Sequence, residues 1–265
     1  SKAYSQGIKT IQTRWVTTRQ LQRATSVPKG ETDLLKNPGF YVYGVPQNTL
    51  NMDNVGCLYV IAAALMITPE EFVKQCISKI KESSVDLFKI LLNGRLIKYF
   101  IDINDVLSEL DRIISQKLVP SRLDFSLWNE LFIDFARILF GKWTITLDDR
   151  TIDTSGTSIK VAHDNIHLIL PSYIQESVEL IPVSTPDMPL TREFIIILRR
   201  SRKNKNILAN DYYYYPIFVF VPHEFFKTLE IKKRVFTQDD GIISLFRSLI
   251  DRTIKEKSTV VTEIN

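Results

Sequence analysis

The fold of this chain is decided first by residues 57–66, which read CLYVIAAALM. Almost every side chain here is apolar, a pattern too dense for any face of the segment to meet water, so it predicts a buried helix. Residues 68–71, TPEE, then supply an N-cap hydroxyl, a proline at the first helical position and two acids near the positive end of the helix dipole. That combination predicts a second helix that runs to about Glu82.

Three more helices are predicted before Gly141. Residues 84–98 and 104–116 read as two of them. The third, residues 126–140, has the best amphipathic pattern, and Gly141 closes it. Its apolar side chains at helical spacing are Leu127, Leu131, Phe135 and Ile138.

Strand patterns dominate after Gly141. The segments that read as strands are 143–147, 158–162, 166–170, 194–200 and 212–221. The last two flank the polar segment 201–210, which predicts a long hairpin or two neighbouring strands. Asp148 and Asp149 are expected to turn the chain.

The two ends of the chain carry weaker patterns. At the N-terminal end, residues 15–23 predict a short helix, and residues 40–43, FYVY, predict a short strand between Pro-Gly and Gly-Val-Pro. At the C-terminal end, residues 240–255 predict a last helix.

The order of these elements predicts an α+β fold, with a helical N-terminal half packed on a mostly antiparallel sheet from the C-terminal half. We expect residues 1–265 to form a single domain with an N-terminal extension, 1–44, and a C-terminal helical segment, 223–265. Hydrophobic residues make up 45% of the chain and charged residues 24%, which is the composition of a folded, water-soluble protein.

Composition also argues against several classes of function. The net charge of +4 is too small to argue for nucleic acid by itself. Two cysteines make neither a disulfide framework nor a four-cysteine zinc site, and they indicate a reducing compartment. We see no apolar run long enough for a membrane span, no signal peptide and no glycine-rich phosphate loop. We therefore expect a cytoplasmic protein with no cofactor and no membrane partner.

Histidines give no metal site in this reading. His163 and His167 lack a third ligand in the same phrase, so zinc is not expected. His223 follows a proline and reads as a surface turn residue. Richness in Ile, Lys and Asn hints at a viral or protist source, in which case the location would be the host cytoplasm or the virion.

The candidate chemistry centres on the phrase DNVGCLY at residues 53–59. A cysteine at the start of a buried helix is a sensible nucleophile, because the helix N-terminus favours the thiolate and free backbone N–H groups there can hold an oxyanion. The alternative is that Cys57 is a small core hydrophobe. Cys76, inside the next helix, reads as a packing residue.

This phrase resembles the signature of the ovarian-tumour-domain (OTU) cysteine proteases, a papain-like group of deubiquitinases, which is Asp-Gly-x-Cys-Leu-aromatic at the head of a buried helix. The helix opened by Trp128-Asn129-Glu130-Leu131 and followed by the 143–147 strand also fits that family. The resemblance covers residues 45–222. It implies Cys57 as nucleophile, with Asp53 or Asn54 as an orienting or oxyanion group.

The chain departs from the family where its catalytic histidine belongs. The match to the histidine strand is residues 212–217, YYYYPI, and tyrosine cannot serve as the base because its pKa is about 10. Asp53 is also one residue too far from Cys57, and Gly56 replaces the usual asparagine. A second alignment makes His167 the base.

We therefore rank first a non-catalytic protein-binding or scaffold module that is part of a larger viral or intracellular protein, with ubiquitin or a component of a viral or transcription assembly as partner. An active cysteine protease or deubiquitinase that uses Cys57, His167 and Asp53 ranks third.

A nucleic-acid-associated module ranks second, because five basic residues lie in residues 199–205 beside tyrosines. Charge suits phosphates and rings suit base stacking. The contact residues would be Arg199, Arg200, Arg202, Lys203, Lys205, Tyr213 and Tyr215. The plain alternative is a solvated turn. Residues 212–221 would also invite strand addition by a partner if they formed a sheet edge.

Overall fold

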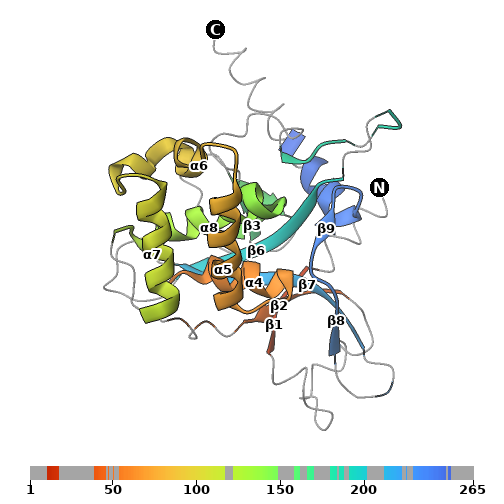
Figure 1. The fold of residues 1–265 in the computed structure, drawn as a ribbon. Helices are drawn as coiled ribbons and strands as arrows, with labels where there is room; N and C mark the ends of the chain where they lie inside the picture. The colour runs from red at the N-terminus through yellow and green to blue at the C-terminus, as the bar shows by residue number, and fades with distance from the viewer. Residues whose placement is uncertain are drawn as a thin grey trace, which may run out of the picture. The chain divides into compact units, whose positions relative to one another are not determined.

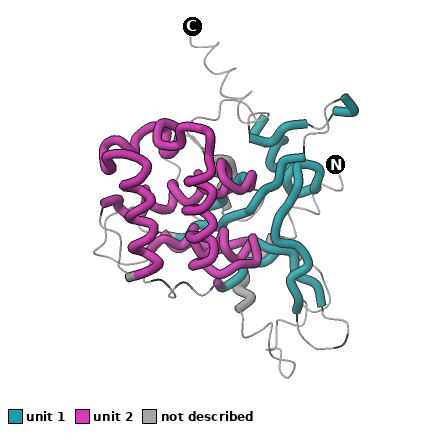
Figure 2. The backbone as a smooth tube through the Cα atoms, in the orientation of Figure 1, with its two compact units in different colours: residues 1–44, 143–200, 217–265 teal, residues 45–142, 201–216 magenta. Residues whose placement is uncertain are grey.

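A computed structural model of the chain reveals an α+β protein (Figure 1). The residues that it describes are 11–17, 39–45, 47, 50, 54–116, 122–148, 158–161, 166–169, 180–183, 185–187, 191–201, 212–222, 225, 229–248 and 250–251. They group into two compact units, which Figure 2 shows in two colours. One is a sheet unit, from Ser1–Gly44, Trp143–Arg200 and Ile217–Asn265, and the other is a helical unit, from Val45–Lys142 and Ser201–Pro216. The single-domain expectation stays a prediction.

The helical unit begins with α4 (Gly56–Leu65) and α5 (Pro69–Glu82), both as predicted. α4 is buried along almost its whole length, because nothing in its sequence suits water. In α5 the Thr68 hydroxyl accepts a hydrogen bond from the Glu71 N–H at 3.1 Å, so the local capping signal is used as expected.

Two other helices of this unit also confirm the sequence patterns. α7 (Ile103–Gln116) packs beside α5, and α8 (Phe125–Phe140) packs against α4 (Figure 1). α8 is capped at its start by the Asp124 side chain and ends at Gly141, whose φ of +64° is left-handed. Stacked and edge-on aromatic rings fill the core between the helices: Phe72, Trp128, Phe132 and Phe135.

The continuous helix predicted over residues 84–98 is wrong. The chain forms one short turn, α6 (Leu87–Ile90), and then the 3-10 segment η1 (Leu91–Lys98). Leu92, Asn93 and Gly94 interrupt η1 with positive φ angles of 51°, 55° and 78°. Asn-Gly is a turn dipeptide, and it was the available signal for this break.

The sheet unit is built on nine described strands in the order β1-β2-β7-β6-β3-β5-β4, with β8 beside β7 and β9 beside β6. Their bounds are β1 (Ile11–Thr17), β2 (Gly39–Gly44), β3 (Lys142–Asp148), β4 (Ser158–Val161), β5 (Ile166–Ile169), β6 (Glu193–Ser201), β7 (Tyr212–Pro222), β8 (Leu229–Lys233) and β9 (Phe236–Thr237). The first five residues of β7, and Lys142 of β3, belong to the helical unit. β1 pairs with β2 in parallel, and the other pairs with a described register are antiparallel, as expected.

Several local expectations for this sheet fail. Residues 15–17 are part of strand β1 rather than of a helix, because they pair with β2. Asp148 ends strand β3 and is buried, so it is not a turn residue. The segment 223–265 is not wholly helical, since it supplies β8 and β9 before the helix at residues 241–248.

β7 is the neighbour of β6, as predicted, but it is not a sheet edge. Its register with β2 runs from Ile217 to Phe220, and β6 is its neighbour on the other side. The idea that β7 offers an open edge for strand addition is therefore wrong.

Candidate functional site

The candidate site is the head of α4, inside the helical unit. Val55 is the N-cap residue, and its side chain has no oxygen to cap the helix. Cys57 follows two residues later and is 0% exposed, without a disulfide bond. The first turn of a helix has backbone N–H groups with no partner of their own in the helix, so another part of the chain must bind them.

Asn129 of α8 performs this role. Its Oδ1 accepts a hydrogen bond from the Cys57 N–H at 3.0 Å, and its Nδ2 donates to the Asn54 carbonyl at 3.2 Å. The same Nδ2 also donates to the Phe125 carbonyl, one turn back in α8, at 2.9 Å. The Cys57 N–H is therefore not one of the free N–H groups at this helix start, because a buried side-chain amide binds it.

Tyr214 of β7 closes the same helix start from another side. A Cβ added to Gly56 would lie 2.9 Å from the Tyr214 Cβ and 3.2 Å from its backbone nitrogen. Gln47 Nε2 donates to the Tyr214 carbonyl at 2.7 Å, and this bond holds the tyrosine segment in place. Glycine at position 56 is thus required by close approach of the backbone.

Of the other predicted catalytic residues, the structure describes Asn54 and His167. Asp53 lies outside the described residues. Asn54 uses its carbonyl for Asn129, while its buried Oδ1 has no hydrogen-bond partner within the described part of the chain. His167 belongs to β5 of the sheet unit, in register with Asp148 of β3 and Lys160 of β4. His163 and His223 lie outside the described residues.

Cys76 is a core residue, as expected. It is fully buried within α5. Burial raises the pKa of its thiol far above the ordinary value, and nearby Lys79 offsets this only in part. A thiol held in this protonated form is a poor nucleophile.

The basic segment begins at the end of β6. Arg199 Nε donates to the buried Asp148 Oδ2 at 2.6 Å, so this guanidinium joins β6 to β3 within the sheet unit. Arg200 is the next residue of β6, while Arg202, Lys203 and Lys205 lie outside the described residues. In the helical unit Tyr213 is 39% exposed, and its ring stacks on Tyr215 with centroids 6.2 Å apart.

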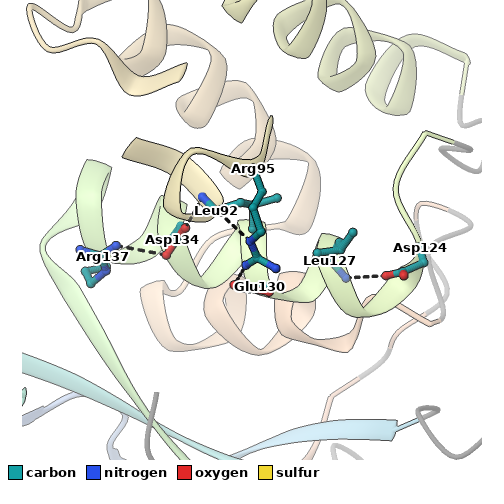
Figure 3. Close-up of polar contacts among 7 residues, drawn as sticks. All are labelled: Leu92, Arg95, Asp124, Leu127, Glu130, Asp134 and Arg137. Atoms are coloured by element: carbon teal, nitrogen blue, oxygen red, sulfur yellow. Dashed lines mark hydrogen bonds and ion pairs between the residues drawn. The ribbon is translucent and has the colours of Figure 1, made fainter. Parts of the chain in front are cut away.

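Sequence reasoning missed a second polar network, on the same helix α8 (Figure 3). The buried Asp134 accepts a hydrogen bond from the Leu92 N–H at 2.8 Å and pairs with Arg137 at 3.2 Å. Arg95 Nε donates to the Leu92 carbonyl at 2.8 Å, and its guanidinium pairs with Glu130. These contacts hold the left-handed turn of η1. The available signal was Asp134 as the single charged residue in the otherwise apolar run 131–136, LFIDFA.

Neither a metal site nor a single membrane-spanning helix is found in the described ranges. No group of three His, Cys, Asp or Glu side chains there could hold a metal ion. No described helix is long and apolar enough to cross a membrane alone, although α4 and α5, bent by 87°, pass such a test as a pair. Comparisons with protein-family models, curated proteins and solved structures gave no match. The resemblance to OTU proteases therefore rests on this chain's own residues.

Proposed function

We propose that this chain is a non-catalytic protein-binding or scaffold module, in which the head of α4 is a closed remnant of an OTU-like cysteine site. The observation that carries the proposal is the hydrogen bond from the Cys57 N–H to Asn129 Oδ1. An oxyanion would need that N–H, and an acyl substrate would need access to a thiol that is 0% exposed.

Tyr214 supports the same proposal. The resemblance assigns the family's catalytic histidine to the strand that begins YYYYPI, and in this chain Tyr214 of that strand packs on Gly56, next to Cys57. A phenol does not act as a base toward a thiol at neutral pH. The position that needs a base thus holds a packing residue.

The test is intact mass after incubation with ubiquitin that carries a C-terminal electrophile. We expect no adduct on the wild-type chain. Alkylation of the two thiols in denaturant, and their protection in buffer, show that the chain is present and folded. An adduct that forms on the wild type and is lost in Cys57→Ala would overturn the proposal in favour of a working cysteine protease.

The exposed tyrosine pair favours a second candidate, a nucleic-acid-associated module. Tyr213 and Tyr215 offer a stacked pair of rings, one of them exposed, on which a base can stack. Fluorescence anisotropy of a labelled single-stranded oligonucleotide, titrated at low salt, tests this candidate. It predicts binding that weakens steeply with salt and with Tyr213→Ala, and absence of binding at low salt would end it.

A further inference from the structure

The segment Leu96–Ile101, which we call the knuckle, projects apolar side chains from the helical unit. Leu96 and Phe100 are buried, and they fix the segment to the core. Ile97 and Ile101, between and after them, are 72% and 85% exposed, and Tyr99 is 38% exposed. Three large apolar side chains within five residues form a local apolar patch, which is typical of a protein interface.

The backbone of the knuckle is held at both ends. At the first end, the α8 carboxylates Glu130 and Asp134 bind Arg95 and the Leu92 N–H, as described above. At the other end, the Ile101 N–H donates to Asp105 Oδ2 at 3.0 Å, and Asp105 also pairs with Arg122.

The left-handed turn adds to this evidence. Leu92 and Asn93 adopt positive φ, which is unfavourable for residues with a Cβ and persists only where the surroundings enforce it. Because the backbone is held in this way, the side chains of Ile97 and Ile101 stay exposed to water and are not buried in the core. Exposed apolar side chains on a preorganised backbone lose little freedom when they bind.

An open groove with a mixed apolar and polar lining lies in the same unit, and Ile103, two residues after the end of the knuckle, is part of that lining. The volume of the groove is about 360 Å³. Five apolar side chains line it: Ile80, Val85, Leu87, Ile103 and Leu107. Val85 is 55% exposed, so this groove also leaves apolar surface in contact with water.

The knuckle carries one cation, and the lining of the groove includes one acid that can meet it. The exposed Lys98 stands between Ile97 and Tyr99 in the knuckle, and no ion pair in the described structure uses it. The groove is lined by the carboxylate of Asp86 and also by the ammonium of Lys81. Asp86 makes only an exposed 3.6 Å contact with Lys89, so its carboxylate is open to a further cation.

We infer that the knuckle docks into this groove on a second copy of the chain, with Lys98 of one copy against Asp86 of the other. The two features adjoin along the chain, so a two-fold pair buries both knuckles and both grooves at once. This names a partner for the protein-binding role and rests on that proposed function. The two can fail separately: a ubiquitin adduct removes the non-catalytic role and leaves the pair, whereas a strictly monomeric chain removes the pair alone.

Sedimentation equilibrium of the full chain tests the inference. We expect a concentration-dependent mass that reaches twice that of the chain. The double variant Ile97→Ser/Ile101→Ser should raise the dissociation constant by about tenfold or more, the usual effect of truncating an interface hot spot. Met66→Asn is the matched control, because Met66 is 75% exposed but lies at the C-cap of α4 in a left-handed conformation that asparagine tolerates.

The charge pair gives a second and stricter readout. Lys98→Glu and Asp86→Lys should each weaken the pair, and the two changes together should restore much of it. The Asp86 side chain caps no helix N–H, so the reversal breaks no capping bond. A single-chain mass at every concentration up to about 0.5 mM, a pair unaffected by the double serine variant, or a charge reversal without recovery would each overturn the inference.

Discussion

The head of α4 and the left-handed turn that precedes the knuckle are two regions where α8 supplies a buried side-chain oxygen to a backbone N–H of another segment. At the first, Asn129 binds the Cys57 N–H and closes a helix start. At the second, Asp134 binds the Leu92 N–H and holds a left-handed turn, beyond which apolar side chains meet water. The hydrogen bonds are similar, but the first lies beside a buried helix start and the second beside exposed apolar side chains. A buried polar residue thus indicates where the backbone is held, and it does not indicate whether the neighbouring surface is exposed to solvent.

The largest effect is expected from removing the side-chain amide of Asn129 at the head of α4. Asn129→Leu keeps the side-chain volume but leaves the Cys57 N–H and the Asn54 carbonyl without their partner. Buried groups left unbonded cost about 1–3 kcal/mol each, so we expect the free energy of unfolding to fall by about 3 kcal/mol. Urea denaturation measures this. Gln75→Leu, which removes only an exposed bond to Glu71, is the control, and an equal loss in both variants would contradict the role of Asn129.

A second change at the closed region adds one carbon atom. Gly56→Ala places a Cβ 2.9 Å from the Tyr214 Cβ, closer than such contacts occur. Overpacking of this kind costs about 2 kcal/mol. The matched control is Gly241→Ala, since a Cβ there meets nothing within 4 Å. Thermal unfolding compares the two, and an unchanged stability for Gly56→Ala would show that Tyr214 does not press on the helix start.

At the open region a glycine matters for a different reason. Gly94 has a φ of +78°, which a residue with a Cβ adopts at a cost of about 1 kcal/mol, and a Cβ there would also lie 3.2 Å from the Lys89 carbonyl oxygen. Gly94→Ala should therefore lower the free energy of unfolding by about that amount, less than Gly56→Ala. Urea denaturation measures the free energy of unfolding of both variants. A larger loss for Gly94→Ala than for Gly56→Ala would contradict the predicted order.

The smallest effect is a pH dependence at the end of the knuckle. The hydrogen bond from the Ile101 N–H, and then the contact with Arg122, lower the pKa of Asp105 below its ordinary value. A lowered folded-state pKa means that the ionised carboxylate stabilises the fold above the unfolded pKa of about 3.9, and that this is lost as the pH falls through the lower folded pKa.

The backbone amide signal of Ile101 reports this titration in an NMR experiment. In the wild type it should shift with a midpoint below about pH 3.9, and in Asp105→Asn this transition should disappear. A midpoint at or above the ordinary aspartate pKa would contradict the contact.

Much of the helical unit follows from local sequence signals. The dense apolar run of α4, the capped start of α5 and the amphipathic period of α8 all predicted elements within two residues of their observed bounds, because each signal acts within a few turns. The α+β class follows from the order of such elements. Cys57 was also correctly placed at a buried helix start, but the binding of its N–H by Asn129 was not predicted.

The errors have two causes: the Asn93-Gly94 turn signal was overlooked, and the other deciding partners lie far away along the chain. Residues 84–98 fail as one helix because Asp134, 42 residues beyond Leu92, holds the left-handed turn. Residues 15–17 are strand because β2 pairs with them, and Asp148 is no turn because Arg199 of β6 binds it. Local propensity cannot include partners that folding alone brings near.

By itself, then, the sequence determined most of the helices and strands and the position of a cysteine at the head of α4, since helix capping and apolar periodicity act between near neighbours. Only the tertiary structure decided that Asn129 and Tyr214 close that head and that Asp134 and Asp105 hold the knuckle open to solvent. Those outcomes depend on buried donors and acceptors finding partners far away in the chain, because an unbonded polar group in the core is costly.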